Sequence, residues 1–188
     1  MDFRKATTVG VLAAAVVYSG YLIHQAAHPP GTVTSAGQEH HATVGDLPGD
    51  VAPNFVLKTP AGKTVELSSL RGHGVWLNFW ATWCPNCKVE LPIVEQEHKI
   101  FGNQVQIIGV DVQESAQTVA KFSAERGLTY PMVLDSQGGV AAAYGVTALP
   151  TSVFIGPNGV IRAVYTGAMS NLAMATHYLN AIRHLPVE

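Results

Sequence analysis

From Val51 onward, short and mainly apolar runs alternate with longer segments that carry apolar residues along one helical stripe. The runs 74–81 and 104–111 are too short for globular helices, so they predict buried strands. The pattern predicts further strands at 54–58, 63–67, 130–134, 151–155 and 160–166, and helices at 84–101, 115–126, 140–144 and 171–184. This alternation predicts an α/β domain with a central mixed sheet flanked by helices.

Glycine and proline mark the turns between these elements. The turn 59–62 predicts a hairpin ahead of the main sheet, and the Asn-Gly pair within 156–159 predicts a second hairpin near the end. Pro92 falls inside the helix predicted at 84–101, where it removes one backbone donor and kinks the helix.

The beginning of the chain follows a different pattern. No Asp, Glu, Lys or Arg occurs between Lys5 and Glu39, and residues 6–23 are mainly apolar. Eighteen helical residues span roughly 27 Å, close to a hydrocarbon core of about 30 Å. Residues 1–27 are therefore predicted to be a cytoplasmic start and a transmembrane anchor. Arg4 and Lys5 precede the apolar run, so the rest of the chain is expected outside the cytoplasm.

Two other interpretations of this segment stay open. A cleaved signal peptide also has a basic start and a short apolar run, and cleavage would leave a secreted or periplasmic domain. A buried amphipathic helix is disfavoured because no polar face recurs at helical spacing.

Residues 28–49 are rich in Pro, Gly, Ser, Thr and His, a composition that cannot bury enough apolar surface to fold alone. They predict a flexible linker between the anchor and a domain at 50–188. The histidines in and beside this segment allow a metal-binding tail as an alternative to a polar linker: His24, His28, His40 and His41.

Composition excludes several classes of protein. Hydrophobic residues make up 47% of the chain and charged residues 13%, which excludes an intrinsically disordered protein. The net charge is −2, with 11 scattered Lys and Arg residues, so no basic face is available for nucleic acid. Two cysteines cannot form a multi-disulfide scaffold or supply the four ligands of a zinc site.

The two cysteines are the main chemical signal. Cys84-Pro85-Asn86-Cys87 follows a predicted buried strand and begins a predicted helix. A thiol in the first turn of a helix faces unpaired amides and the positive end of the helix dipole, which stabilise a thiolate. Its pKa should fall below about 8.5, which makes Cys84 the attacking sulfur. Cys87 lies one turn further on and can close a disulfide ring with it.

Structural interpretations of this pair are weaker. Half of a zinc knuckle would need a second Cys or His pair, and the domain's other histidines lack ligand spacing. A permanent structural disulfide suits an oxidising compartment, but a two-residue loop at a helix start gives little entropic stabilisation.

The segment from Asn78 to Lys88 (NFWATWCPNCK) and the segment 145–151 (GVTALPT) resemble the thioredoxin superfamily. The resemblance implies a thioredoxin-like fold. It also implies a cis peptide bond before Pro150, beside the sulfurs, and a backbone at Leu149 that pairs with an extended substrate. Cis bonds occur almost only before proline, and the alternative is an ordinary trans turn proline.

Finer features resemble the membrane-anchored, exported TlpA/ResA-like branch: the anchor, the linker, the hairpin, and the segments 49–55 and 67–72. Thioredoxin has a buried Asp where this chain has Asn78. Proteins of the ResA type have a Glu beneath the site, and Glu90 occupies that place. A buried Glu90 would have a raised pKa and could exchange protons with Cys87, whereas the alternative is a solvated helix carboxylate.

These features predict an extracytoplasmic thiol-disulfide oxidoreductase. Trp83 and Pro85 are expected to shape the apolar surface around Cys84, with Trp80 in the core. No metal or organic cofactor is required, because the sulfurs of Cys84 and Cys87 carry both electrons. The resemblance implies client proteins with disulfides, such as apocytochrome c during cytochrome c maturation, and a thiol-disulfide electron donor in the membrane.

Two other functions stay open. The opening Ala52-Pro-Asn-Phe55 suggests a peroxiredoxin-like peroxidase, whose site would need a Thr or Ser before a single Cys. Thr82 lies two residues before Cys84, but the adjacent CxxC favours dithiol exchange. A copper-carrying assembly factor would bind metal through Cys84, Cys87 and a histidine, but its relatives use a wider cysteine spacing.

Overall fold

The computed structural model describes residues 43–183 of the 188-residue chain. Their core is a seven-stranded sheet with the strand order β2-β1-β5-β4-β3-β6-β7. The strands are β1 (Val56–Lys58), β2 (Thr64–Glu66), β3 (Gly74–Trp80), β4 (Val105–Val112), β5 (Met132–Asp135), β6 (Thr151–Ile155) and β7 (Ile161–Thr166). The helices are η1 (Leu67–Leu70, a 3₁₀ helix), α2 (Pro85–Phe101), α3 (Ala116–Arg126), α4 (Gly139–Ala143) and α5 (Leu172–Arg183).

The sheet is mixed, as predicted. Strands β3, β4 and β5 are parallel, while β6 is antiparallel to β3 and β7 is antiparallel to β6. All seven residues of β3 are buried, which fits its uninterrupted apolar sequence and its central place in the sheet. The end of β3 therefore lies beside the end of β4 and the beginning of β6.

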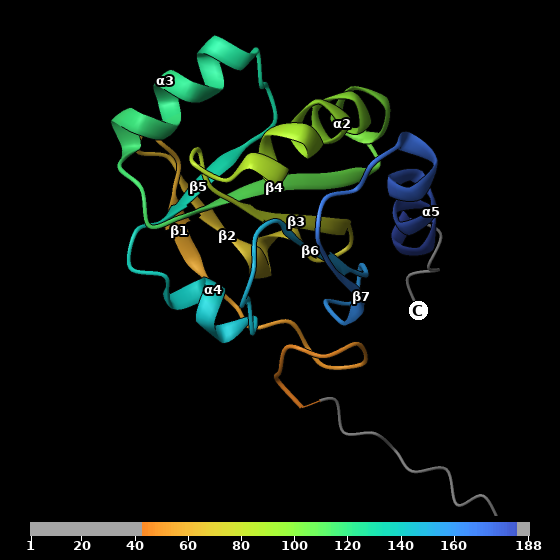
Figure 1. Ribbon diagram of the computed structural model, residues 1–188. Helices are drawn as coiled ribbons and strands as arrows, with labels where there is room; N and C mark the ends of the chain where they lie inside the picture. The colour runs from red at the N-terminus through yellow and green to blue at the C-terminus, as the bar shows by residue number, and fades with distance from the viewer. Residues whose placement is uncertain (1–42, 184–188) are drawn as a thin grey trace, which may run out of the picture. The chain divides into compact units, whose positions relative to one another are not determined.

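Helices cover both faces of this sheet. Figure 1 shows α2 and α3 on one side and α4 on the other. One group of buried residues joins α2, α3 and α5 to the sheet and includes Trp76, Trp80 and Leu179. A second group on the opposite face includes Phe79 and Tyr144, whose rings lie 5.5 Å apart. The sheet thus has a separate apolar core on each face.

Local sequence signals set the ends of the helices. Ser115 accepts a hydrogen bond from the backbone N–H of Thr118 and caps α3, and Gly127 ends that helix with a left-handed φ of 65°. Helix α2 continues through Pro92 to Phe101. Strand β5 begins at Met132, two residues later than predicted, because Pro131 has no N–H to donate to a ladder.

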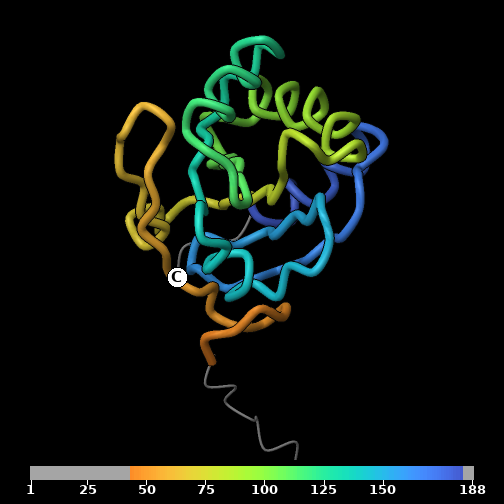
Figure 2. The backbone as a smooth tube through the Cα atoms, turned by 60° about the vertical axis from the view of Figure 1, so that its left-hand side comes forward, coloured from red at the N-terminus to blue at the C-terminus, as the bar shows by residue number. Residues whose placement is uncertain are grey.

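The predicted N-terminal hairpin is present and extends the sheet. Strands β1 and β2 pair in antiparallel register, and β1 also pairs with β5 through Lys58 and Leu134. Figure 2 shows this hairpin, in orange and yellow, at one side of the domain. Residues 43–52 are also joined to the domain, since Gly49 N–H donates to the Ile161 carbonyl at 2.9 Å.

The predicted anchor, most of the predicted linker and its histidines lie outside the described residues. Among residues 43–183, no helix combines the length and apolar character needed to cross a membrane.

A pair of glycine substitutions tests the packing of α5 on the sheet. In Gly74→Ala the new Cβ would lie 2.9 Å from the backbone carbonyl oxygen of Ile182, so α5 must move. We expect this variant to lose about 1–3 kcal/mol of unfolding free energy in urea titrations.

Gly139→Ala is the matched control, because its Cβ would meet no atom within 4 Å at the start of α4. It should equal or slightly exceed the wild type in stability. Equal stability of the two variants would contradict the described contact between α5 and β3.

Candidate active site

Cys84 and Cys87 form a disulfide at the beginning of α2, with a Cα–Cα distance of 5.3 Å. Cys84 is the N-cap residue of the helix, and Pro85 occupies its first turn. The Cys84 sulfur accepts a hydrogen bond from the Cys87 backbone N–H at 3.1 Å. Cys84 therefore lies where unpaired amides and the helix dipole favour a negative charge.

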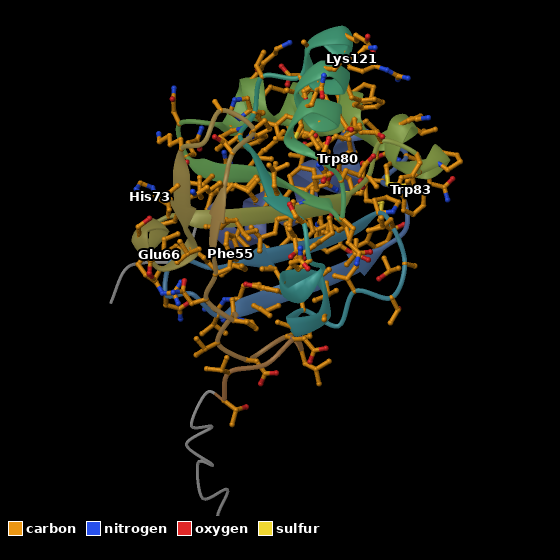
Figure 3. All side chains as sticks on the ribbon, turned by 90° about the vertical axis from the view of Figure 1, so that its left-hand side faces the viewer. Phe55, Glu66, His73, Trp80, Trp83 and Lys121 are labelled. Carbon is orange, nitrogen blue, oxygen red and sulfur yellow. A yellow bond between two sulfur atoms is a disulfide. The ribbon has the colours of Figure 1, made fainter. Side chains whose placement is uncertain are left out.

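Both cysteines are buried in the oxidised protein, next to exposed residues. Cys84 keeps 3% of its surface exposed and Cys87 is fully buried. Pro85 is exposed beside them, and Trp83 is 65% exposed. Figure 3 shows Trp83 at the periphery of the domain and Trp80 in its interior, where Trp80 is fully buried. The residues around Cys84 thus present an apolar surface to solvent.

The sheet topology brings Leu149 and Pro150 to the same end of the domain. Strand β6 begins at Thr151, which pairs with Phe79 near the end of β3. The Leu149–Pro150 peptide bond is cis, Pro150 is buried and Leu149 is half-buried. Two segments far apart in the sequence therefore meet beside the start of α2.

Glu90 lies one helical turn after Cys87 and is fully buried. Its Oε2 accepts a hydrogen bond from Asn78 Nδ2 at 2.8 Å, and its Oε1 accepts one from the Met169 backbone N–H at 3.0 Å. Burial raises the pKa of Glu90 above its ordinary value of 4.5, and the two hydrogen bonds oppose this shift. Glu90 is therefore a buried acid that holds its proton more readily than a solvated glutamate.

A chain of buried polar groups extends from Glu90 across the sheet. Asn78 Nδ2 also lies 3.4 Å from the hydroxyl of Ser152, which accepts a hydrogen bond from Trp76 Nε1 at 2.8 Å. Asn78 Oδ1 has no hydrogen-bond partner among residues 43–183. These contacts fix the position of Glu90, and no local sequence pattern pointed to Ser152 or Met169 as part of this network.

A second group of polar residues beside the active site, Thr82, Glu114 and Asp111, was not predicted from the sequence. Thr82 donates two hydrogen bonds to Glu114, and Glu114 N–H donates to buried Asp111. Burial and the nearby Glu114 raise the pKa of Asp111 to about 8. The order of the elements could have indicated this contact. Thr82 and Glu114 follow neighbouring parallel strands, and the carboxyl ends of such strands meet at one edge of the sheet.

Among residues 43–183, no group of three or more His, Cys, Asp and Glu side chains is arranged to hold a metal ion. The histidines of the predicted linker lie outside this range.

Several solved structures share this fold, and one of them is named for exchange between thiols and disulfides. A thiol:disulfide interchange protein of the thioredoxin family from Chlorobium tepidum matches with a TM-score of 0.64 and 28% identity, over 75% of this chain and 99% of its own. StoA from Bacillus subtilis matches with a TM-score of 0.60 and 28% identity, over 71% and 98%. The fold and the paired cysteines define a thioredoxin-like thiol-disulfide oxidoreductase.

Sequence comparison gives the family. The family model described as AhpC/TSA family matches residues 48–164. Thiol-disulfide oxidoreductase ResA of Bacillus subtilis (strain 168) is 40% identical over 175 residues, which cover 93% of this chain and 90% of that protein. The chain belongs to the AhpC/TSA family and is a homologue of the ResA thiol-disulfide oxidoreductases. The resemblance to thioredoxin-like and ResA-type proteins is thus confirmed.

The raised pKa of Glu90 predicts a pH dependence of stability. Because the folded pKa exceeds the unfolded one, Glu90 favours folding below the unfolded value and loses this contribution as pH rises through the folded value. In the oxidised protein, Glu90→Gln should flatten the decline of unfolding free energy as the pH rises above 4.5, the ordinary pKa of the group. The change in slope is at most about 1.4 kcal/mol per pH unit.

Urea titrations of both proteins at several pH values measure this slope. Glu125→Gln, at an exposed position on α3, is the matched control and should keep the wild-type slope. If Glu90→Gln also keeps that slope, Glu90 does not have a raised pKa.

Proposed function

We propose that this thiol-disulfide oxidoreductase works outside the cytoplasm as a reductant of client-protein disulfides, in cytochrome c maturation or a related assembly process. The observation that supports the proposal best is the position of Cys84 at the start of α2. Its sulfur lies at the N-cap of α2, bonded to Cys87 and bordered by exposed apolar side chains. This is the place in a helix where a thiolate is best stabilised.

The reaction needs only the two cysteines and the client. In the reduced protein, the Cys84 thiolate attacks one sulfur of the client disulfide, so a mixed disulfide forms and the other client sulfur leaves as a thiolate. The Cys87 thiolate then attacks the Cys84 sulfur. The internal disulfide forms, the client leaves fully reduced, and two electrons have passed from this protein to the client. Glu90 can take up the proton that Cys87 releases.

Exposed residues on both sides of Cys84 suit an extended client segment. Trp83 and Pro85 offer apolar contact, and the backbone at Leu149, before cis Pro150, offers the polar groups of an unfinished strand edge. An unfolded polypeptide such as apocytochrome c fits this surface better than a compact protein, because its disulfide and backbone are both accessible.

The proposed location depends on the first 27 residues. An anchor with Arg4 and Lys5 on the cytoplasmic side would leave the cysteines outside, tethered to the membrane surface. Each cycle ends with an oxidised Cys84–Cys87 pair, so continued reduction of clients requires a thiol-disulfide electron donor, which we place in the same membrane. No metal or organic cofactor takes part in the proposed cycle.

Two other functions predict different measurements. A peroxiredoxin-like peroxidase would consume peroxide through Cys84, whereas the Thr82 hydroxyl before this cysteine already donates to Glu114. A copper-carrying factor would retain copper stoichiometrically and would not reduce disulfides. We favour dithiol exchange over both, because Cys84 and Cys87 are within bonding distance of each other.

A Cys87→Ser variant of the full-length chain tests the proposed cycle. Without Cys87 the mixed disulfide cannot be resolved, so Cys84 should accumulate covalent adducts with exported client proteins. Non-reducing gels and mass spectrometry of the adducts measure this and identify the clients.

Cys84→Ser is the matched control and should give no adducts, because the attacking sulfur is gone. Adducts with cytoplasmic proteins alone would contradict the proposed location. A wild-type protein that fails to reduce a model disulfide, together with an adduct-free Cys87→Ser variant, would contradict the proposed reaction.

A further inference from the structure

The segment that leads into Cys84 is held from the side by a carboxylate on another loop. Glu114 follows β4, and Thr82 follows β3, the neighbouring parallel strand. Thr82 N–H donates to Glu114 Oε2 at 2.5 Å, and the Thr82 hydroxyl donates to Oε1 at 2.6 Å. Thr82 therefore donates both of its polar hydrogens to one carboxylate. Hydrogen bonds to carboxylates are shorter and stronger than those between neutral groups.

These two bonds act on the turn that delivers the attacking sulfur. Cys84 N–H donates to the Ala81 carbonyl at 3.3 Å, so Thr82 and Trp83 are the central residues of a turn between β3 and α2. Fixing the first central residue fixes the direction of the second, and it fixes the entry of Cys84 into its N-cap position. The carboxylate thus restrains the turn from which Trp83 and Cys84 project.

Packing alone does not hold this turn. Trp83 is largely exposed, and Thr82 borders an open hollow of about 390 Å³ lined also by residues of α3, among them Gln117 and Phe122. A side chain beside an open hollow is free to change its rotamer unless hydrogen bonds restrain it. The bonds from Thr82 to Glu114 supply that restraint.

The loop that carries Glu114 is itself shaped for this contact. Glu114 N–H donates to Asp111 Oδ1 at 3.2 Å, and Gln113 N–H donates to the Asp135 carbonyl at 3.1 Å. Gln113 has a φ of 65°, a left-handed conformation that costs a residue with a long side chain some strain. Since the raised pKa leaves Asp111 mainly protonated at pH 7, Asp111 does not repel a carboxylate at position 114.

We propose that Glu114 is a positioning residue for disulfide exchange, which orients Trp83 and Cys84 by binding both polar hydrogens of Thr82. This inference rests on the proposed function. It adds a residue on the β4–α3 connection to a site otherwise built from α2 and the segment before β6.

The chain contains a second pair with the same geometry far from this turn. Glu95 accepts hydrogen bonds from Thr129 N–H and from the Thr129 hydroxyl, both at 2.7 Å. This pair joins the middle of α2 to the segment before β5, and Lys99 lies 3.1 Å from Glu95. Loss of this pair should weaken the fold without moving Cys84, so it provides a matched control.

The test compares Glu114→Ala, Glu114→Gln and Glu95→Ala in the full chain, with a peptide disulfide as the substrate. The second-order rate constant of disulfide reduction is measured for reduced protein under conditions in which each variant is folded. Glu114→Ala should react about tenfold more slowly or worse, since small displacements of a reacting group are costly. Glu114→Gln should keep most of the rate, because an amide can accept from Thr82 N–H and donate to its hydroxyl. Glu95→Ala should lose stability but keep the wild-type rate.

A second pair of variants serves if Glu114→Ala does not fold. Thr82→Val removes the hydroxyl donor and should slow the reaction about threefold, whereas Thr82→Ser keeps the donor and should react like the wild type.

If the wild-type protein is active, any one of three results would overturn the inference. They are a wild-type rate in Glu114→Ala or Thr82→Val, an equal loss of rate in Glu95→Ala, and a Glu114→Gln variant as slow as Glu114→Ala. An inactive wild-type protein would instead overturn the proposed function on which the inference rests.

Discussion

The path of the chain out of strand β3 is the constraint on which the active site depends. The chain leaves a fully buried central strand at Trp80, makes one turn, and begins α2 with Cys84 as the N-cap. A sulfur at this position accepts hydrogen bonds that other N-cap residues would accept through oxygen, so the stability of the helix start and the reactivity of the thiol share one cause. The buried strand and the two packed faces of the sheet hold this arrangement rigidly.

Two carboxylates, the buried Glu90 and the half-buried Glu114, lie on two sides of the sulfur pair. Glu90 lies on α2 itself and is tied through Asn78 and the Met169 backbone to β3 and to the segment before α5. Glu114 lies on the β4–α3 connection and holds the turn before Cys84. We propose that Glu90 takes part in proton transfer and that Glu114 orients the attacking sulfur, and exchange between a thiolate and a disulfide depends on both.

Much of the fold could be predicted from local pattern. The apolar run at 74–81, the CxxC at its end and the Asn-Gly turn each act over a few residues, and the structure places them as expected. The contacts of Glu90 and Glu114 could not be predicted in this way, because Met169 lies 79 positions from Glu90 and Thr82 lies 32 positions from Glu114, and both contacts depend on strand order. Strand order was implied only by the family resemblance. The predicted anchor and linker lie outside the described residues and stay predictions.

The most direct test of the account is a redox titration of the purified protein, combined with the pH dependence of Cys84 alkylation. Free thiols are counted after equilibration in dithiol and disulfide buffers of known potential. The account predicts one reversible two-electron transition, with about 30 mV for each tenfold change in the ratio of disulfide to dithiol, and a Cys84 pKa below about 8.5. A pair that stays locked in one form over the whole range, or a Cys84 that alkylates like an ordinary thiol, would contradict it.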